Sequence, residues 1–236
     1  MAAPAAVPMH CWRRWRAMPR LLFEKKGNAV WISHLDLMRM FQRAFNRAGL
    51  RLTHTQGFNP RPSVSIALPL SVGIESSCEL LDFQLEGDAV PNEEILARLN
   101  AALVEGVKVL AVYDDGLKIK NLAYLDCTLS LEYDRGVPQG AMEAIRELFS
   151  REELLVSKKS KNGVTEQNII PMIRSFEIAQ KDTNTLFIKA RVCCQNPSLN
   201  PMQLCTAIEE MLPDFSPDFA KFSRNEIYDF QEQIFR

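Results

Sequence analysis

The spacing of apolar residues predicts a helix in the first fifth of the chain. Between Ser33 and Gly49 one apolar face repeats at helical spacing, and its members are Leu37, Met38, Phe41, Phe45 and Ala48. Ser33 is a typical N-cap residue with Asp36 as its capping-box partner, and Gly49 is typical of the residue that follows a helix. By contrast, residues 64–70 alternate between apolar and small or polar side chains, which is the period of a strand.

The same reading, applied to the whole chain, gives one order of elements in the first half and repeats it more loosely in the second. In the first half we predict strands at residues 21–25, 64–70, 79–86 and 107–113, and helices at 33–48 and 92–103. In the second half we predict strands at residues 127–133, 176–179, 186–193 and 222–230, helices at 139–149, 166–173 and 202–212, and an extended segment at 154–159. Strand, helix, two strands, helix, strand is the ferredoxin-like βαββαβ plan.

This order predicts an α+β protein with two tandem ferredoxin-like (βαββαβ) domains. We expect an N-terminal domain at residues 20–116 and a C-terminal domain at 117–236, with the boundary near Asp114 to Gly116. Residues 1–19, which contain an Arg-rich cluster, are expected to be a disordered arm or a wrongly assigned start, with Met18 as the true first residue.

Composition narrows the class of protein. The 236 residues carry a net charge of -1, so the total charge indicates no particular partner. The six cysteines contain no Cys-x-x-Cys pair, and we expect them to be reduced thiols in a cytoplasmic protein without a metal or other cofactor. No apolar run approaches the roughly 20 residues that cross a bilayer, so we expect no contact with a membrane.

Charge is distributed unevenly despite this total. Residues 20–62 contain eight basic residues and only two acidic ones, a local charge of +6. Arg39, Arg43 and Arg47 are four residues apart and therefore form one stripe on the predicted helix. Guanidinium groups suit phosphate geometry, so the stripe is a candidate RNA-binding surface. A solvated face of a surface helix is the structural alternative.

The segment after this helix, residues 56–62, is a loop because it contains a glycine and two prolines. Phe58 offers a ring for stacking, while Gln56, Asn59 and Arg61 can contact base edges or phosphates. A structural connection, in which Phe58 fills the core and the amides bond the backbone, is the alternative.

His34 lies at the start of the predicted basic helix. A helix N-terminus favours bound anions, so His34 is a candidate acid or base acting on a phosphodiester. His54 is a weaker candidate, and capping or packing explains His34 equally well. The sequence contains no phosphate-binding glycine loop, nucleophile elbow or His-Glu zinc motif.

Several motifs together resemble a known bacterial family. They are the runs at residues 32–39, 47–50, 56–62 and 67–76, which read ISHLDLMR, RAGL, QGFNPRP and ALPLSVGIES. The sequence resembles the bacterial radical-SAM-linked protein family over residues 21–228. That resemblance implies a companion role beside a cobalamin-binding radical SAM protein.

The predicted order of elements is also similar to that of the tandem ferredoxin-like endoribonucleases that process CRISPR repeats. The glycine-rich C-terminal loop of those nucleases is missing from this sequence. We therefore expect a non-catalytic accessory module that binds RNA for a radical SAM partner. A metal-independent endoribonuclease using His34 and a protein-interaction adaptor are the two alternatives.

Overall fold

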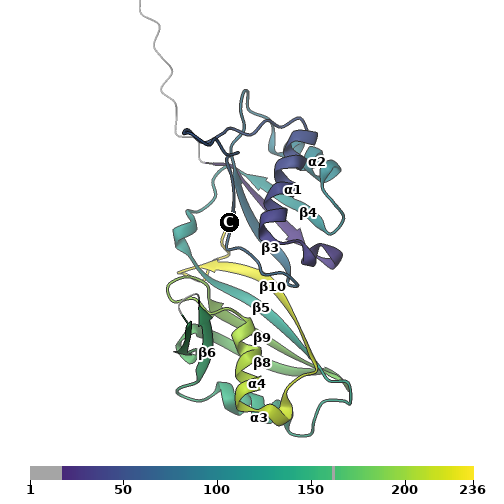
Figure 1. Ribbon diagram of the computed structural model, residues 1–236, viewed down its shortest axis with the longest axis vertical. Coiled ribbons are helices and arrows are strands. Elements are labelled where there is room, and N and C mark those ends of the chain that lie inside the picture. The colour runs from purple at the N-terminus through teal and green to yellow at the C-terminus, as the bar shows by residue number, and fades with distance from the viewer. Residues whose placement is uncertain (1–17, 161–162) are drawn as a thin grey trace, which may run out of the picture.

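The computed structural model of the protein describes residues 18–160 and 163–236, so the predicted N-terminal arm lies almost wholly outside it. The first half contains β1 (Arg20–Lys25), η1 (Gly27–Trp31), α1 (His34–Arg47), β2 (Val64–Ala67), β3 (Glu75–Phe83), α2 (Asn92–Ala102) and β4 (Val107–Tyr113). These elements form the upper part of the molecule in Figure 1.

The second half forms the lower part of the molecule (Figure 1). Its elements are η2 (Ile119–Asn121), β5 (Leu122–Glu132), α3 (Ala141–Phe149), β6 (Leu155–Ser160), β7 (Gly163–Asn168), η3 (Ile170–Met172), β8 (Ile173–Asp182), β9 (Thr185–Cys193), α4 (Met202–Met211), η4 (Pro213–Phe215) and β10 (Phe219–Asp229). The predicted mixture of helices and strands is therefore confirmed.

One eight-stranded sheet runs through both halves. Its order is β4-β1-β3-β10-β5-β9-β8, and β2 pairs with residues 80–83 of β3, beyond the two residues of β3 that pair with β10. Neighbouring strands are antiparallel except β3 and β10, which run parallel and pair at Glu75 with Ser223 and at Ser76 with Arg224. Within each half, leaving out β6 and β7, the spatial order is fourth, first, third and second strand.

Strand β3 contributes side chains to both hydrophobic cores. Leu81 and Phe83 belong to the core of the first half, where they pack with the phenylalanines of α1. Cys78 and Leu80 belong to the larger core, which extends through the second half. Alternate residues of a strand point to opposite faces, so one strand can join two cores.

The predicted helix at residues 166–173 is wrong. This region is strand β7, which pairs with β6 in a separate two-stranded sheet, followed by the short turn η3. Pro171 explains part of the difference, because proline lacks the amide hydrogen that a helix interior requires. The pairing of β6 with β7 satisfies the backbone groups that a helix would have satisfied internally.

The remaining predicted elements are present, with shifted ends. The strand predicted at 107–113 has those bounds in the structure, whereas the one predicted at 79–86 is β3, which begins at Glu75 and ends at Phe83. Strands β5 and β8 each begin earlier than predicted. No helix in the described part of the chain is long and apolar enough to cross a membrane.

Candidate functional site

Helix α1 is fixed to the sheet by a polar cap and an apolar face. The Ser33 hydroxyl accepts a hydrogen bond from the Asp36 amide at 3.2 Å and donates one to the Asp36 carboxylate at 2.8 Å, so the predicted N-cap is confirmed. Phe41 and Phe45 are fully buried, and the Phe41 ring meets the edge of Phe23 with 4.8 Å between ring centroids. The opposite face of α1 is left to solvent.

The arginine stripe lies on this outer face. Arg39, Arg43 and Arg47 are all exposed and, with Asp36, Met40 and Val104, line a shallow depression of about 420 Å³. Their side chains are not equally engaged. Arg39 Nη1 lies 2.9 Å from Asp36 Oδ1, and Arg47 Nη2 donates to the Ala102 carbonyl at 2.5 Å.

Arg43, in the middle of the stripe, makes no hydrogen bond or ion pair with any described residue. Its guanidinium is therefore the one whose donors are fully available to a ligand. The hydrogen bond from Ser33 and then the Arg39 guanidinium hold the pKa of Asp36 below its ordinary value, so this carboxylate stays charged and offsets part of the stripe.

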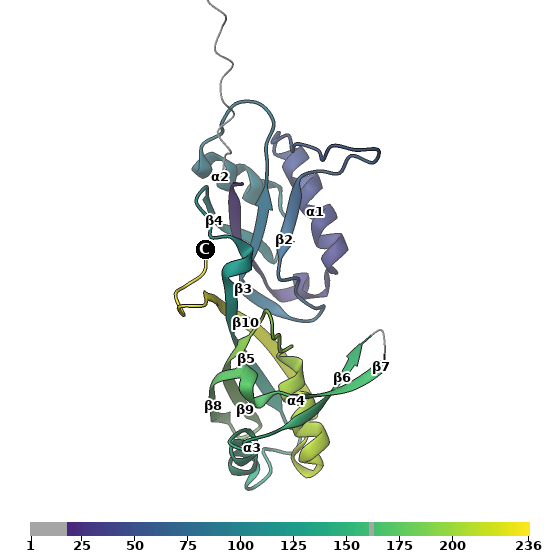
Figure 2. The ribbon, with the colours of Figure 1, turned by 90° about the vertical axis from the view of Figure 1, so that its left-hand side faces the viewer.

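The loop after α1 is held by its own backbone. The Thr55 amide donates to the Arg61 carbonyl at 2.8 Å, and the Ser63 amide donates to the Thr53 carbonyl at 2.7 Å. The Arg61 amide also donates to the Thr55 hydroxyl at 3.0 Å. The segment is thus an ordered hairpin-like loop, and it projects from the body beside α1 in Figure 2.

Phe58 at the tip of this loop is fully exposed, at 102% of its reference area. The structure therefore excludes the alternative in which Phe58 fills the core. The side chains of Gln56, Asn59 and Arg61 are exposed, and none of them makes a hydrogen bond within residues 18–160 and 163–236. The side-chain amides of Gln56 and Asn59 therefore do not hydrogen-bond the local backbone, and all three side chains are available to a ligand.

A hollow of about 700 Å³ lies beside the loop. Residues from the loop, including His54 and Gln56, line it together with Gln84 and Glu86. His54 Nδ1 lies 3.9 Å from Glu86 Oε1 at its rim. The loop therefore borders one acidic residue, which the count of charges over residues 20–62 did not include.

His34 and the loop lie at opposite ends of α1. His34 is the first of its 14 residues, and the loop follows its last turn. At 1.5 Å per residue the helix is about 20 Å long. His34 and His54 therefore do not face one phosphodiester as an acid–base pair.

Sequence reasoning missed a set of buried charges where the two halves meet. Lys25, Glu79 and Arg224 are each at least 92% buried, and all three stand on strands of the shared sheet. The alternation along β3 could have revealed Glu79, because it places this residue on the same strand face as the buried Leu81 and Phe83.

The cysteines and acidic residues do not form a metal centre in the described part of the chain. No group of three or more His, Cys, Asp or Glu side chains there is placed to hold a metal ion. Cys78, Cys127, Cys193, Cys194 and Cys205 are all buried as free thiols. All five belong to the larger hydrophobic core, and the prediction of reduced thiols is confirmed for them.

Comparison with known proteins identifies a family. The family model DUF2344, described as "Uncharacterized protein conserved in bacteria", matches residues 19–201, and the chain belongs to this family. No match links the chain to radical SAM proteins, and the curated proteins contain no match to it.

Solved structures resemble the chain only distantly. A Cbf5–Nop10–Gar1 complex aligns with a TM-score of 0.49 and 8% identity, covering 89% of this chain and 49% of that one. An archaeal box H/ACA sRNP Nop10–Cbf5 complex aligns with a TM-score of 0.43 and 8% identity, covering 88% and 47%. This chain thus spans about half the length of each of these two proteins.

Proposed function

We propose that this DUF2344 protein is a cytoplasmic accessory module that binds single-stranded RNA across the arginine stripe and the loop that follows α1. One observation carries the proposal, namely the fully exposed ring of Phe58 on an ordered loop. An exposed ring contributes no burial free energy to the fold, whereas stacking of a base on it stabilises a complex by about 1–3 kcal/mol.

The surrounding side chains match the other parts of an RNA strand. Arg43 and Arg61 have unengaged guanidinium groups for phosphates, and Gln56 and Asn59 have unengaged amides for base edges. Arg39 and Arg47 keep part of their donors for phosphates, because each makes a single hydrogen bond within the described residues.

We further propose that the two halves are ferredoxin-like units, at residues 20–116 and 117–236. The repeated strand order of fourth, first, third and second supports this division, since it is the order that a βαββαβ unit gives when its central strands are the first and third. The β6–β7 hairpin is then an insertion in the second unit.

The partner we propose is a radical SAM protein. Support for this comes from the motif resemblance at residues 32–39, 47–50, 56–62 and 67–76 alone. Affinity purification of the tagged chain, from bacteria that encode such a partner beside it, tests the proposal. Recovery of the partner with the chain is the expected result, and its repeated absence would remove the partner from the proposal.

RNA binding is tested by a salt titration. Filter binding of a labelled single-stranded RNA of mixed sequence is compared between wild type and the Arg43→Ala, Arg61→Ala double variant. Each lost phosphate contact weakens binding for every sequence and flattens the salt slope by about 0.7. The double variant is therefore expected to lose about 1.4 from the slope, as well as affinity.

The matched control is the Arg135→Ala, Arg151→Ala double variant. It removes the same charge from exposed positions in the second half, outside the candidate surface. Equal losses in both variants would mean that only net charge matters. No loss in either would favour an adaptor whose stripe contacts protein.

A further inference from the structure

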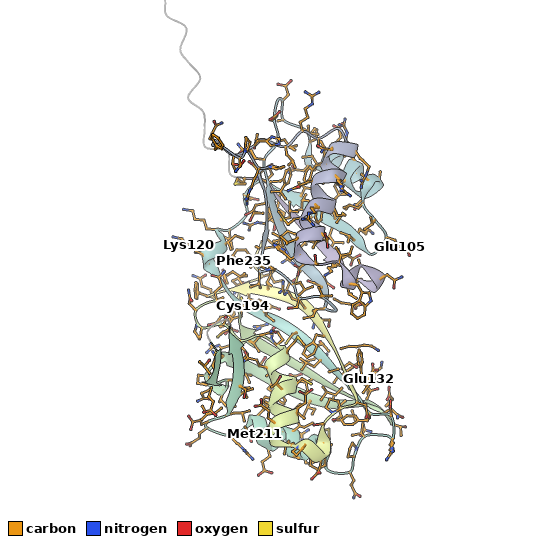
Figure 3. All side chains as sticks on the ribbon, viewed as in Figure 1. Glu105, Lys120, Glu132, Cys194, Met211 and Phe235 are labelled. Carbon is orange, nitrogen blue, oxygen red and sulfur yellow. The ribbon has the colours of Figure 1, made fainter. Side chains whose placement is uncertain are left out.

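A small cavity lies where the two halves meet, away from the candidate RNA-binding surface. Its volume is about 210 Å³, and its walls come from the segment after β2, from β5 and β10, and from the segment that leads into α4. Cys194, one of its lining residues, marks this level of the molecule in Figure 3. Most of the lining is apolar, including Leu70, Leu125 and Phe222.

Among the residues that the structure describes, Arg224 is the one charged residue in the lining, and its side chain is 91% buried. Its Nη1 atom donates to the Leu68 carbonyl at 2.9 Å and to Glu79 Oε1 at 2.7 Å. Those are the only hydrogen bonds that the guanidinium makes to residues the structure describes. The donors of Nη2 and Nε therefore have no partner among these residues, and Arg224 itself lines the cavity.

The buried charges around this site do not balance. Glu79 is 1% exposed and is the single carboxylate that bonds Arg224, yet its charge also acts on Lys25, another 1% exposed cation. Two buried cations thus share one buried anion. An uncompensated buried charge is costly, so the site favours an additional anion.

The entry to α4 adds to this positive potential. Asn200 and Pro201, directly before the first helical residue Met202, line the cavity. The N-terminus of a helix carries a partial positive charge. The cavity therefore combines a buried guanidinium, a helix N-terminus and apolar walls.

We propose that this cavity binds a small organic acid, with its carboxylate on Arg224 and its apolar body against Leu70, Leu125 and Phe222. The size fits, because an engineered apolar cavity of about 150 Å³ binds benzene. A single inorganic anion would leave the apolar walls unfilled. The carboxylate would join β10 of the second half and the segment after β2 of the first through one ligand.

Isothermal titration of the full chain with benzoate and with 3-methylbutanoate tests the site. At least one of these acids is expected to bind about tenfold more tightly than the neutral benzyl alcohol, because a charge-assisted hydrogen bond stabilises its complex more than a neutral one does. Inorganic phosphate, which lacks an apolar body, is expected to bind more weakly than the acids. Binding of phosphate alone, or of no probe, would overturn the proposal.

Two variants locate the binding. Ser198→Trp places a large ring at the exposed rim of the cavity and leaves the buried charges intact, so it is expected to abolish binding of the acid. Ser65→Trp, at an exposed position of β2 outside the cavity, is the matched control and is expected to leave binding unchanged. Equal binding by both variants would contradict the assignment.

A peptide with a free C-terminus carries the same carboxylate chemistry. Titration with acetyl-Ala-Val separates a free acid from the end of a partner chain. Weaker binding of the peptide than of the better acid is expected. Tighter binding of the peptide would overturn the assignment to a small molecule.

Discussion

Nη1 of Arg224 lies 2.7 Å from Oε1 of Glu79, and this buried ion pair joins β10 of the second half to β3 of the first. The two strands are parallel and pair at only two positions. The ion pair therefore adds a side-chain link beside this short stretch of backbone pairing between the halves.

Removal of the charge on Glu79 is expected to destabilise the whole molecule. Glu79→Gln leaves two buried cations without a carboxylate, and breaking a buried pair from one side typically costs about 3–5 kcal/mol. Urea unfolding measures the loss. Glu132→Gln is the control, since it breaks the exposed ion pair with Lys221, where about 0–1 kcal/mol is expected. Similar losses in both would mean that the buried pair has no special role.

Phe58 is expected to matter for RNA and not for folding. Because its ring touches solvent on all sides, Phe58→Ala is expected to change the free energy of unfolding by less than about 0.5 kcal/mol. The same change is expected to weaken RNA binding by about 1–3 kcal/mol through the lost stacking. Phe230→Ala, at another exposed phenylalanine, serves as the control and is expected to leave RNA affinity unchanged.

The N-cap of α1 predicts a specific titration. The Ser33 hydroxyl is the first cause of the lowered pKa of Asp36, so Ser33→Ala is expected to raise that pKa toward its ordinary value. A carboxyl with a lowered pKa contributes stability at higher pH that is lost as the pH falls through its folded-state pKa. NMR titration of the Asp36 carboxyl carbon measures the shift. Asp182, whose lowered pKa depends on Asn184 and Thr185, is the internal control.

The buried thiol of Cys127 is expected to make stability fall in alkaline solution. Burial raises its pKa to about 12 from an ordinary value of 9.0. Between these values the unfolded chain releases the proton while the folded chain keeps it, so the unfolded state gains stability as the pH rises. The loss of stability caused by Cys127→Ala is therefore expected to shrink above pH 9.0. A pH-independent difference in urea unfolding would contradict this.

Local patterns in the sequence were sufficient for most elements of the fold. The helix from His34 and the strand from Val107 to Tyr113 follow from side-chain spacing and from end signals such as Ser33. Residues 166–173 were predicted wrongly, because their pattern has no strong period and their strand depends on pairing with β6. Pairing partners of an isolated segment cannot be read from that segment.

Sequence reasoning likewise predicted one part of the functional surface and missed another. Arg39, Arg43, Arg47 and Phe58 were predicted from local spacing and turn chemistry, and the structure leaves all four exposed. The cavity at Arg224 was not found, since Leu68 and Arg224 are 156 positions apart in the chain. The pairing of β3 with both β2 and β10 brings those residues together.

That pairing has a consequence for how the protein would work in an assembly. Because β3 and β10 are strands of one sheet and β3 supplies side chains to both cores, the halves are joined by paired backbone and by shared packing. An RNA bound across α1 and its loop would therefore keep one orientation relative to the second half, and the direction of its strand would be set by the sheet.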